Sequence, residues 1–414
     1  MLTRRDFVGR TALLPFAAAA QNTGPVRIAI VTTIYRYLSH GQHIGDRFLV
    51  GYPYAGKWHQ PNVKVVSLYV DQKPDGDLSE VRAREFGFRV YPTIAEALCC
   101  GGRKLACDAV LIVGEHGNYP RNEKGQTLYP RYEFFEQCVQ VFKDSGHSVP
   151  LYNDKHLSYS FEKAQAMVAA SKELGFPMLA GSSVPVTWRL PDVDMPMGAH
   201  IEDAVMVGFG GSDAMDFHTL EGLQCMMERR YGGETGIKAV QLLEGDKVWE
   251  AGKNGLWSQQ LLSSALSRSD TPLGLTVKDG RTQDLVGSGV LPSLAPRAAV
   301  YLIEYRDGTR AAMLMLDGAV KDFNFAARVR GAGLISTQFF LSPEPNVTYS
   351  ACLVSKIEQM FESRRAPYPV ERTLLTSGML EACLTSRLQG NQRRTTPHLA
   401  VTYTAPEEAQ YCRV

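Results

Sequence analysis

Between residues 26 and 184, short apolar runs of the kind that form buried strands alternate with segments of helical periodicity. The apolar runs are VRIAIV, VKVVSLYVD, CDAVLIVGEH, SVPLYNDKHLS and FPMLAGSSV. The segment SFEKAQAMVAASKELG spaces its apolar residues as a helix does, with Ser160 as a predicted N-cap and Gly175 as its stop. This alternation predicts βαβ units with right-handed crossovers, and hence a parallel sheet covered by helices. We expect a Rossmann-type α/β domain over residues 25–190.

The pattern changes in the linker that Pro191 and Pro196 bracket. Beyond it, AAVYLIEYRDGTRAAMLMLDG predicts a β-hairpin that turns at Asp307–Gly308. With IEDAVMVGFGG and GIKAVQLLEGD, this hairpin predicts an α+β domain over residues 191–414 that contains a large, mostly antiparallel sheet. We expect its helix at 370–395 to pack back on the first domain. The apolar residues of the hairpin serve either a homo-oligomer interface or a partner within the chain.

The first twenty residues differ from the rest. Arg4 and Arg5 precede Phe7, and the apolar stretch TALLPFAAAA ends in small residues near Ala20. This pattern predicts a twin-arginine signal peptide with a short spacer over residues 1–24, and a periplasmic, exported mature protein. The alternative is an uncleaved basic N-terminus before a short buried helix. Because the exported side of the membrane has no free nicotinamide pool, an exported enzyme must keep any such cofactor bound.

Charge and hydropathy limit the partners. The chain has 44 Lys and Arg residues against 43 Asp and Glu residues, so its net charge of +1 predicts no nucleic-acid partner. After the N-terminal segment, no run reaches the roughly 18 apolar residues that a membrane helix needs. We therefore expect a small-molecule ligand and no integral membrane segment in the mature chain.

Six segments follow one another in a distinctive order: PNVKVVSLYVDQ, AREFGFRVYPTIAEAL, CDAVLIVGEH, PLYNDKHLSYSFEKAQAMVAASKELGFPMLAGSS, FHTLEGLQCMMERRYGG and GMLEACLTSRLQGNQ. In this order they resemble the glucose-fructose oxidoreductase and inositol dehydrogenase family (Gfo/Idh/MocA) over about residues 25–403. The resemblance implies NAD or NADP in the first domain and a sugar or cyclitol in a cleft against the second sheet. We accordingly expect an exported oxidoreductase that acts on a sugar or sugar derivative with tightly bound NAD(P).

The same resemblance implies the site residues. Lys155 in NDKHLS occupies the position of the lysine in the family's E-K-P motif, and His218 matches its substrate-domain histidine, although Ala214 stands where the family has an aspartate. A lysine and a histidine at these positions can move a proton at a substrate hydroxyl. The alternatives are a solvated lysine and a histidine that caps a helix. The implied catalytic residues are Lys155, His218 and Asp154, and the implied substrate residues are His156, Asp213, Asp216 and His116.

The loop after the first strand lacks the glycines of a dinucleotide fingerprint. In RYLSHGQHIGDRF, Gly41 and Gly45 lie too far along to form the tight turn. Residues with side chains, such as Thr32, Thr33 and Tyr35, stand where the fingerprint has glycines, and they block the approach of a pyrophosphate to the backbone. Either the cofactor uses the Ser39 hydroxyl and nearby amides, or the domain has lost nucleotide binding. The expected cofactor-binding residues are Thr32, Thr33, Ser39, Glu115 and Asp71, the last at the position that binds adenosine ribose in such folds.

Histidines and acidic residues also follow three of the predicted parallel strands, and their loops should converge at one sheet edge. Imidazoles gathered there could bind Zn²⁺ or Mn²⁺. The ligands of this alternative are His40, His43, His116 and His156, and the function would be that of a metal-dependent carbohydrate lyase or hydrolase. A third possibility is a non-catalytic sugar-binding protein that has lost the dinucleotide site.

Overall fold

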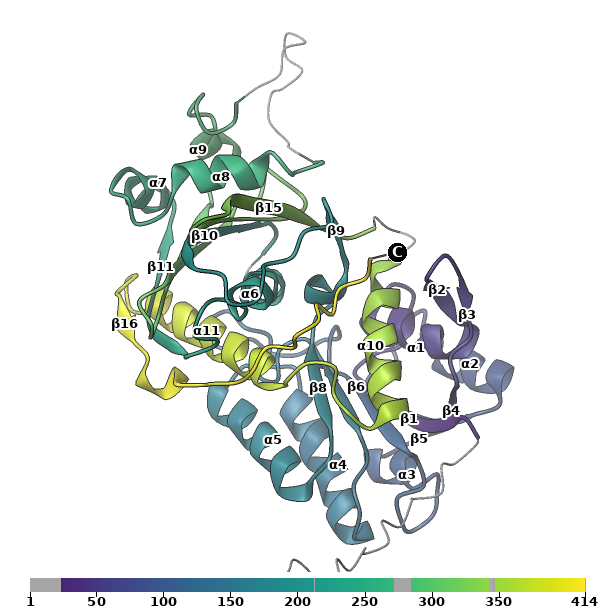
Figure 1. Cartoon of the computed structure of the whole chain (residues 1–414). Helices are drawn as coiled ribbons and strands as arrows, with labels where there is room; N and C mark the ends of the chain where they lie inside the picture. Colours follow the sequence, from purple (N-terminus) through teal and green to yellow (C-terminus); the bar gives the residue numbers. More distant parts are fainter. Residues whose placement is uncertain (1–23, 212, 272–283, 343, 345–346, 414) are drawn as a thin grey trace, which may run out of the picture.

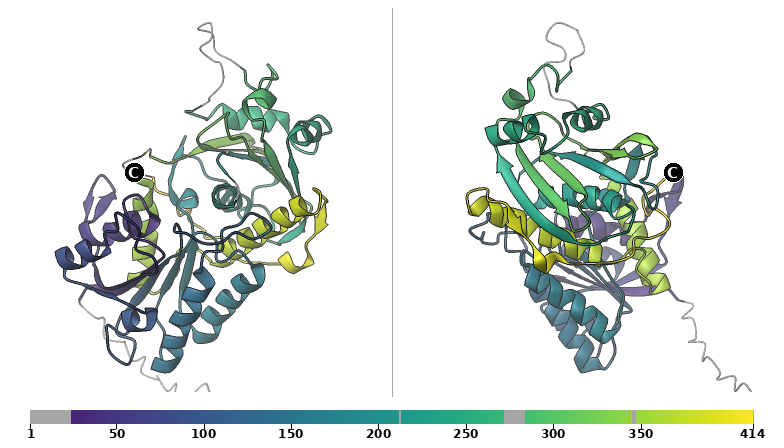
Figure 2. Two further views of the ribbon diagram at one scale, coloured as in Figure 1. Left: turned by 180° about the vertical axis from the view of Figure 1, so that it is seen from behind. Right: turned by 60° about the vertical axis from the view of Figure 1, so that its left-hand side comes forward.

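The computed structural model describes residues 24–211, 213–271, 284–342, 344 and 347–413. The predicted signal peptide lies outside the described residues, apart from Gly24 of its spacer. The structure confirms the predicted fold class, which is a parallel-sheet domain followed by a domain with a large, mostly antiparallel sheet (Figures 1 and 2).

The first sheet has six strands in the order β5-β4-β1-β6-β7-β8, and every neighbouring pair is parallel. Strand order reverses beside β1, as in a Rossmann fold. The central strands are buried on both faces, which explains their continuous apolar runs. In spatial order the six strands are Arg89–Tyr91, Val63–Val70, Val26–Thr32, Ala109–Val113, Leu151–Asp154 and Met178–Gly181.

Helices cover both faces of this sheet. One face packs on α3 (Ile94–Leu98), α4 (Arg131–Ser145) and α5 (Phe161–Leu174), and the other on α1 (His40–Val50) and α10 (Tyr349–Ser363). Helix α10 comes from the second half of the chain and lies beside α1 (Figure 1). The structure confirms the predicted ends of α5, since the Ser160 hydroxyl accepts from the backbone N–H of Lys163 and Gly175 has a left-handed φ of 66°. The first domain also contains α2 (Ser79–Phe86) and the hairpin of β2 (Tyr52–Tyr54) and β3 (Lys57–His59).

The second sheet has eight strands in the order β16-β11-β12-β13-β10-β14-β15-β9, and only the pair β10–β13 is parallel among them. The predicted hairpin is β12 and β13, with Gly308 at a φ of 90° in its turn. Strand β9 already belongs to this sheet, although it ends at the predicted domain boundary. In chain order the eight strands, β9 to β16, are Trp188–Leu190, Ile201–Gly208, Ile237–Glu244, Ala299–Tyr305, Arg310–Met315, Phe323–Val329, Gly333–Phe340 and Arg394–Thr395.

Both faces of the second sheet are covered within the chain. Helices α6 (Ala214–Met227) and α11 (Glu371–Leu388) pack on one face, and α11 also contacts α5 of the first domain. Helices α7 (Asp246–Lys253), α8 (Gln259–Leu266) and α9 (Leu291–Leu294) cover the other face. The apolar residues of the β12–β13 hairpin therefore have intrachain partners. Two short 3₁₀ helices, η1 (Val184–Val186) and η2 (Pro397–Leu399), complete the described elements.

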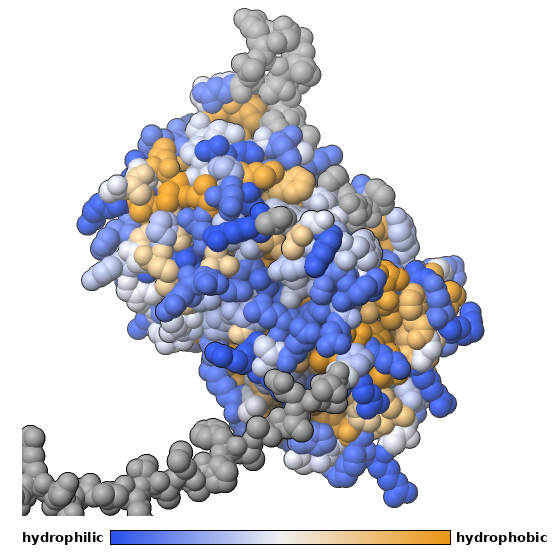
Figure 3. Space-filling view, turned by 45° about the vertical axis from the view of Figure 1, so that its right-hand side comes forward, coloured by the Kyte–Doolittle hydropathy of each residue, from blue (hydrophilic) through white to orange (hydrophobic). Residues whose placement is uncertain are grey.

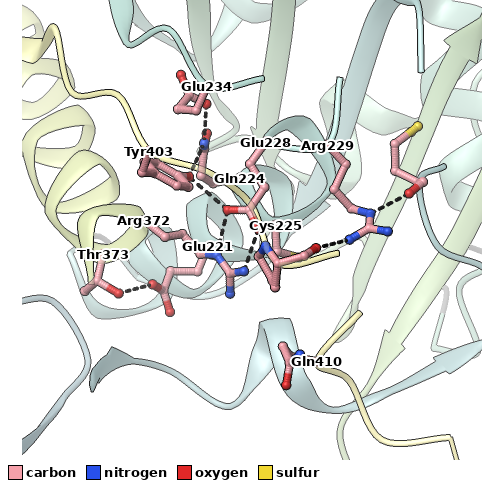
Figure 4. A network of polar contacts seen from close by, with 12 residues as sticks. Glu221, Gln224, Cys225, Glu228, Arg229, Glu234, Arg372, Thr373, Tyr403 and Gln410 are labelled. Atoms are coloured by element: carbon pink, nitrogen blue, oxygen red, sulfur yellow. Dashed lines mark hydrogen bonds and ion pairs between the residues drawn. The ribbon is translucent and has the colours of Figure 1, made fainter. Parts of the chain in front are cut away.

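Helix α6 is buried almost all round, and a polar network pairs Glu221, Gln224 and Glu228 at its C-terminal half (Figure 4). Glu228 accepts from the guanidinium of Arg372, with 2.8 Å between Nε and Oε2, and from the hydroxyl of Tyr403 at 2.9 Å. Glu221 accepts from Thr373 at 3.0 Å, and burial raises its pKa to about 7. The network ties α6 to α11 and fixes the helix that carries His218.

The surface is mixed in character. Hydrophobic residues form separate orange patches among blue ones on the face in Figure 3, and the most exposed large apolar side chains are Tyr231, Tyr37 and Trp58. Among the described residues, no helix combines the length and apolar character that crossing a membrane requires.

Candidate functional site

A cavity of about 780 Å³ lies between the carboxyl ends of the first sheet's strands and the second sheet, and its volume is typical of a small-molecule site. Its two walls differ in character. The first domain and His218 of α6 contribute imidazole, carboxylate and ammonium groups. The second sheet and its loops contribute aromatic and apolar side chains together with polar ones, among them Asp270, Lys321, Asp322, Gln338 and Glu344. We call the side that carries His40, His43, His116, Asp154, Lys155 and His218 the polar wall, and the apolar side chains of the second sheet and its loops, Phe209, Phe323, Phe339, Phe340 and Leu341, the apolar wall.

Lys155 follows β7 directly and is held by a buried charge network. Its Nζ donates to Glu115 Oε1 at 3.0 Å, and Arg131, at the start of α4, pairs with the other carboxylate oxygen. All three side chains are at most 6% exposed. Burial alone would raise the pKa of Glu115, but the positive charges of Lys155 and Arg131 outweigh it and hold this pKa well below its usual value. The ammonium group of Lys155 is thereby fixed at the cavity wall.

The backbone at this edge is unusual. Lys155 has a φ of 57° and His116 a φ of 69°, and both lie in the left-handed region that non-glycine residues rarely adopt. Such conformations cluster at sites where the surrounding structure fixes a side chain for function.

His40, the first residue of α1, pairs with Asp154, the last residue of β7. The distance from Nδ1 to Oδ2 is 2.7 Å, and the two side chains are 17% and 1% exposed. Burial lowers the pKa of His40 well below its usual value, so the imidazole is neutral near pH 7. The chain thus brings together a buried carboxylate and an imidazole that reaches the cavity.

Two further imidazoles lack a partner. Nδ1 of His43 and Nδ1 of His218 are buried and have no hydrogen-bond partner among the described residues. Both side chains line the cavity. Burial lowers the pKa of each well below its usual value, so each ring is neutral near pH 7. A buried polar atom without a partner costs free energy unless a ligand or water satisfies it.

The structure brings Lys155, Asp154, His218 and His116 of the predicted site together around the cavity. His156 is different and corrects the prediction, because its ring faces Arg131, 3.1 Å from Nη1, and packs on Phe217. Since neighbouring residues point in different directions, Lys155 enters the cavity and His156 the interior.

Asp213 and Asp216 also do not line the cavity. They form the capping box of α6, in which the backbone N–H of Asp213 donates to Asp216 Oδ2 at 3.1 Å. Asp216 further accepts from the Tyr301 hydroxyl. Their prediction as substrate residues is corrected to a structural role at the N-terminus of α6. The spacing of two aspartates three residues apart before an apolar run is itself a capping signal.

The structure does not support the metal alternative. The rings of His40 and His43 lie 4.8 Å apart between centroids, and those of His40 and His116 lie 5.1 Å apart. His156 does not join them, and the part of the chain that the structure describes contains no group of three or more His, Cys, Asp or Glu residues arranged to hold a metal ion.

The fold implies a dinucleotide across the carboxyl ends of β4, β1 and β6, at the point where strand order reverses. The residues there do not fit it in the usual way. Segment 33–38 continues through the crevice, where the N–H of Gln72 donates to the Thr33 carbonyl at 2.8 Å and that of Leu78 to the Tyr35 carbonyl at 2.7 Å. Ile34 and Tyr35 are at most 1% exposed. The chain itself thus fills the crevice.

Contacts between the two flanking loops close the same crevice. Asp71, the predicted ribose ligand, accepts from the hydroxyl of Tyr119 at 2.6 Å. Gln72 pairs with the backbone of Asn118, donating at 3.1 Å and accepting at 2.9 Å. Thr33 donates its hydroxyl to the backbone carbonyl of Glu115 at 2.6 Å. Thr33, Asp71 and Glu115, which were predicted to bind the cofactor, instead form hydrogen bonds between the loops that flank the crevice.

Backbone N–H groups at the N-terminus of α1 also have partners within the chain. The Ser39 hydroxyl accepts from the N–H of Gln42 at 3.3 Å, and Nδ1 of His116 accepts from the N–H of His40 at 3.3 Å. In dinucleotide-binding folds, amides at this position bind the pyrophosphate. A Cβ on Gly41 would lie 2.5 Å from the Ile34 carbonyl oxygen, so this glycine allows the loop to pack on α1.

Sequence reasoning missed Arg131, Tyr349 of α10 and the aromatic wall of the cavity. Arg131 carries no local signal, because an arginine at a helix start is ordinarily solvated. Tyr349 lines the cavity from a helix that lies some 300 residues after α1 in the chain, as their numbers show. Only the tertiary packing of α10 on α1 brings it there.

No family model matches the chain, and no curated protein matches it in sequence. Solved structures do share its fold. GenD2 from gentamicin A biosynthesis, in complex with NAD, is 14% identical with a TM-score of 0.54, covering 92% of this chain and 99% of that chain. Scyllo-inositol dehydrogenase from Lactobacillus casei, with bound NAD(H) and scyllo-inositol, is 11% identical with a TM-score of 0.54, covering 90% and 99%. Myo-inositol 2-dehydrogenase from Lactobacillus plantarum is 12% identical with a TM-score of 0.53, covering 90% and 99%. This chain therefore has the two-domain fold of inositol dehydrogenases and related Gfo/Idh/MocA-type oxidoreductases.

Proposed function

We propose that this protein is an enzyme that transforms a sugar or sugar derivative in the cavity between its two domains. One observation carries the proposal: the imidazole side chains of His43 and His218 line the same cavity as the fixed ammonium group of Lys155. Hydroxyl groups of a sugar would form hydrogen bonds with these polar side chains, and the aromatic side chains of the apolar wall suit the apolar face of a sugar ring.

The residues have distinct roles in this proposal. Lys155 donates a hydrogen bond to a substrate oxygen and stabilises negative charge that develops there. His218 approaches from α6 and accepts from a second hydroxyl. Asp154 orients His40, which moves a proton at the reacting group.

The predicted oxidoreductase with tightly bound NAD or NADP draws support from the shared fold, since solved neighbours carry NAD. The filled crevice gives no such support. We therefore rest the proposal on proton transfer, which an oxidation and a redox-neutral reaction both require. A non-catalytic sugar-binding protein would use the same cavity without turnover.

Binding experiments test the proposal. Isothermal titration with monosaccharides and hexuronates should give binding to the protein from residue 21 onward. Lys155→Met and His218→Gln should each weaken it by about 10–100-fold, the cost of a lost hydrogen bond to a charged or buried group. Lys172→Met is the matched control, because the Lys172 side chain is 65% exposed on α5. Equal affinities in all variants would refute the site, and binding without turnover of any sugar would favour the binding protein.

We further propose that the N-terminal segment exports the folded protein. Arg4 and Arg5 and the apolar run that follows support this proposal. In a bacterial host, the wild-type chain should reach the periplasm, and replacement of both arginines by lysine should retain it in the cytoplasm, as cell fractionation will measure. Equal periplasmic amounts of the two proteins would refute the proposal.

A further inference from the structure

In the pair of His40 and Asp154, the donor and the acceptor of the hydrogen bond can be assigned. An ionised carboxylate only accepts hydrogen bonds, so Nδ1 of His40 carries the proton in the 2.7 Å contact with Asp154. In the neutral ring, Nε2 then holds a free lone pair. Asp154 is buried and also lies 3.5 Å from the hydroxyl of Tyr152, whereas His40 lines the cavity. The pair therefore presents a base to whatever occupies the cavity.

The position of this base matters as much as its chemistry. His40 is the first residue of α1, where a dinucleotide-binding domain places the pyrophosphate. Here the loop from Thr33 to Leu38 fills the crevice, and its last contacts fix the helix start, since the Ser39 hydroxyl accepts from the N–H of Arg36 at 3.1 Å. The same segment that closes the dinucleotide groove thus delivers an imidazole to the reaction site.

Resting on the proposed function, we propose that His40 is a catalytic base in a redox-neutral reaction that uses no dinucleotide. The substrate is a sugar derivative that carries a carbonyl or carboxylate group next to the reacting C–H bond. Nε2 of His40 takes the proton as the C–H bond breaks, and the electron pair stays on the substrate as an enolate. The proton, or one exchanged from water, then returns to the carbon. No electrons leave the substrate, so the step needs no oxidant.

The other cavity groups suit this substrate class. The enolate oxygen gains negative charge, which the fixed ammonium group of Lys155 on the polar wall can stabilise. Lys321 lines the cavity as well, from the second domain. His43 and His218 line the same cavity and are left to bind the sugar's hydroxyls. Asp154 acts as a positioning residue through His40. If the protein is exported, such a reaction also removes any need for a nicotinamide supply.

Proton exchange tests the proposal directly. The purified protein from residue 21 onward is incubated in D₂O, without added nucleotide, with glucuronate, galacturonate, fructose or tagatose, and mass spectrometry follows deuterium at carbon. We expect at least one of these probes to gain deuterium. His40→Gln should slow the exchange by about 10²–10⁴-fold and leave sugar affinity within a few fold. His147→Gln, on an exposed residue after α4, should exchange as the wild type does.

A second variant separates positioning from folding. Asp154→Asn should slow exchange at unchanged sugar affinity, because an amide can hold the imidazole in the wrong tautomer, and melting curves will verify that each variant is folded. Exchange that survives in His40→Gln overturns the proposal, as does exchange that requires NAD or NADP. About one equivalent of nicotinamide nucleotide released on denaturation also overturns it. Sugar binding without any exchange refutes this inference and leaves the proposed binding site intact, whereas no binding of any sugar refutes both.

Discussion

Glu115 should be the most costly carboxylate to neutralise in the first domain. It is the anion between two buried cations, with its Oε1 3.0 Å from Nζ of Lys155 and its other oxygen paired with Arg131. Glu115→Gln keeps the shape and removes the charge. At 3.0 Å and an effective dielectric constant near 20, one such attraction is about 5–6 kcal/mol. Because the lost partner leaves buried cations uncompensated, we expect the free energy of unfolding to fall by about 3–5 kcal/mol.

Urea denaturation at pH 7.5, followed by far-UV circular dichroism, measures this loss as a shift of the transition midpoint. The matched control is Glu133→Gln. Glu133 also pairs with a lysine, Lys163, but these side chains are 42% and 31% exposed, so its loss should stay below about 1 kcal/mol. Adding Lys155→Met to Glu115→Gln should recover part of the stability, since one stranded cation is removed. Similar midpoints for the two single variants would refute the reasoning.

The contribution of Glu115 to the free energy of unfolding changes with pH in a definite direction. The pKa of Glu115 lies below its ordinary value of 4.5, so the folded protein binds this proton more weakly than the unfolded chain does. The stabilisation is therefore complete above pH 4.5 and is lost as the pH falls through the lowered pKa. The difference between the wild type and Glu115→Gln should shrink correspondingly in acid. A difference that grows below pH 4.5 would contradict the assigned direction.

Three further predictions concern the scaffold. Glu228→Gln should leave the buried Arg372 without its partner and lower the free energy of unfolding by about 3–5 kcal/mol, which a fall in the melting temperature will show. Methionine at both positions should restore much of the lost stability. Equal melting temperatures of the single and double variants would contradict this. Burial raises the pKa of Glu221 to about 7, so the wild type should lose up to about 3 kcal/mol as the pH rises from 4.5 to 7. Urea midpoints should follow that fall, and Glu221→Gln should flatten the profile. Gly41→Ala should lower the free energy of unfolding in urea by more than about 2 kcal/mol, because its Cβ would lie 2.5 Å from atoms of the preceding loop. Gly24→Ala, with open space around it, should lower it by less than about 0.5 kcal/mol. Equal losses in the two variants would refute the packing argument.

Local physical rules were enough to predict much of the fold. The ends of α5 follow from a serine and a glycine whose roles depend only on nearby backbone groups. The hairpin of β12 and β13 follows from a two-residue signal, Asp307–Gly308, and from strand alternation. Helix α10 was not predicted to complete the first domain. Its packing on α1 joins segments about 300 residues apart, and neither segment alone indicates its partner.

The site was predicted in part for the same reason. The resemblance to the Gfo/Idh/MocA family put Lys155, Asp154 and His218 among the predicted site residues, and all three line the cavity. The direction of a side chain was not predictable, since the left-handed backbone at Lys155 turns His156 away from the cavity. The pairing of His40 with Asp154 depends on the path of the first loop, and no residue pattern specified that path.

That path explains two features of the sequence together. A dinucleotide fold needs glycines after its first strand only where the backbone must approach a pyrophosphate. This chain places Ile34 and Tyr35 there, each at most 1% exposed, and has no glycine between the end of β1 at Thr32 and Gly41. Once side chains fill that space, the helix start no longer has to bind phosphate, and an imidazole can take its place at the cavity. The missing glycines and His40 beside Asp154 are therefore two consequences of one rebuilt loop, and a substitution that reopens the crevice should also displace the base.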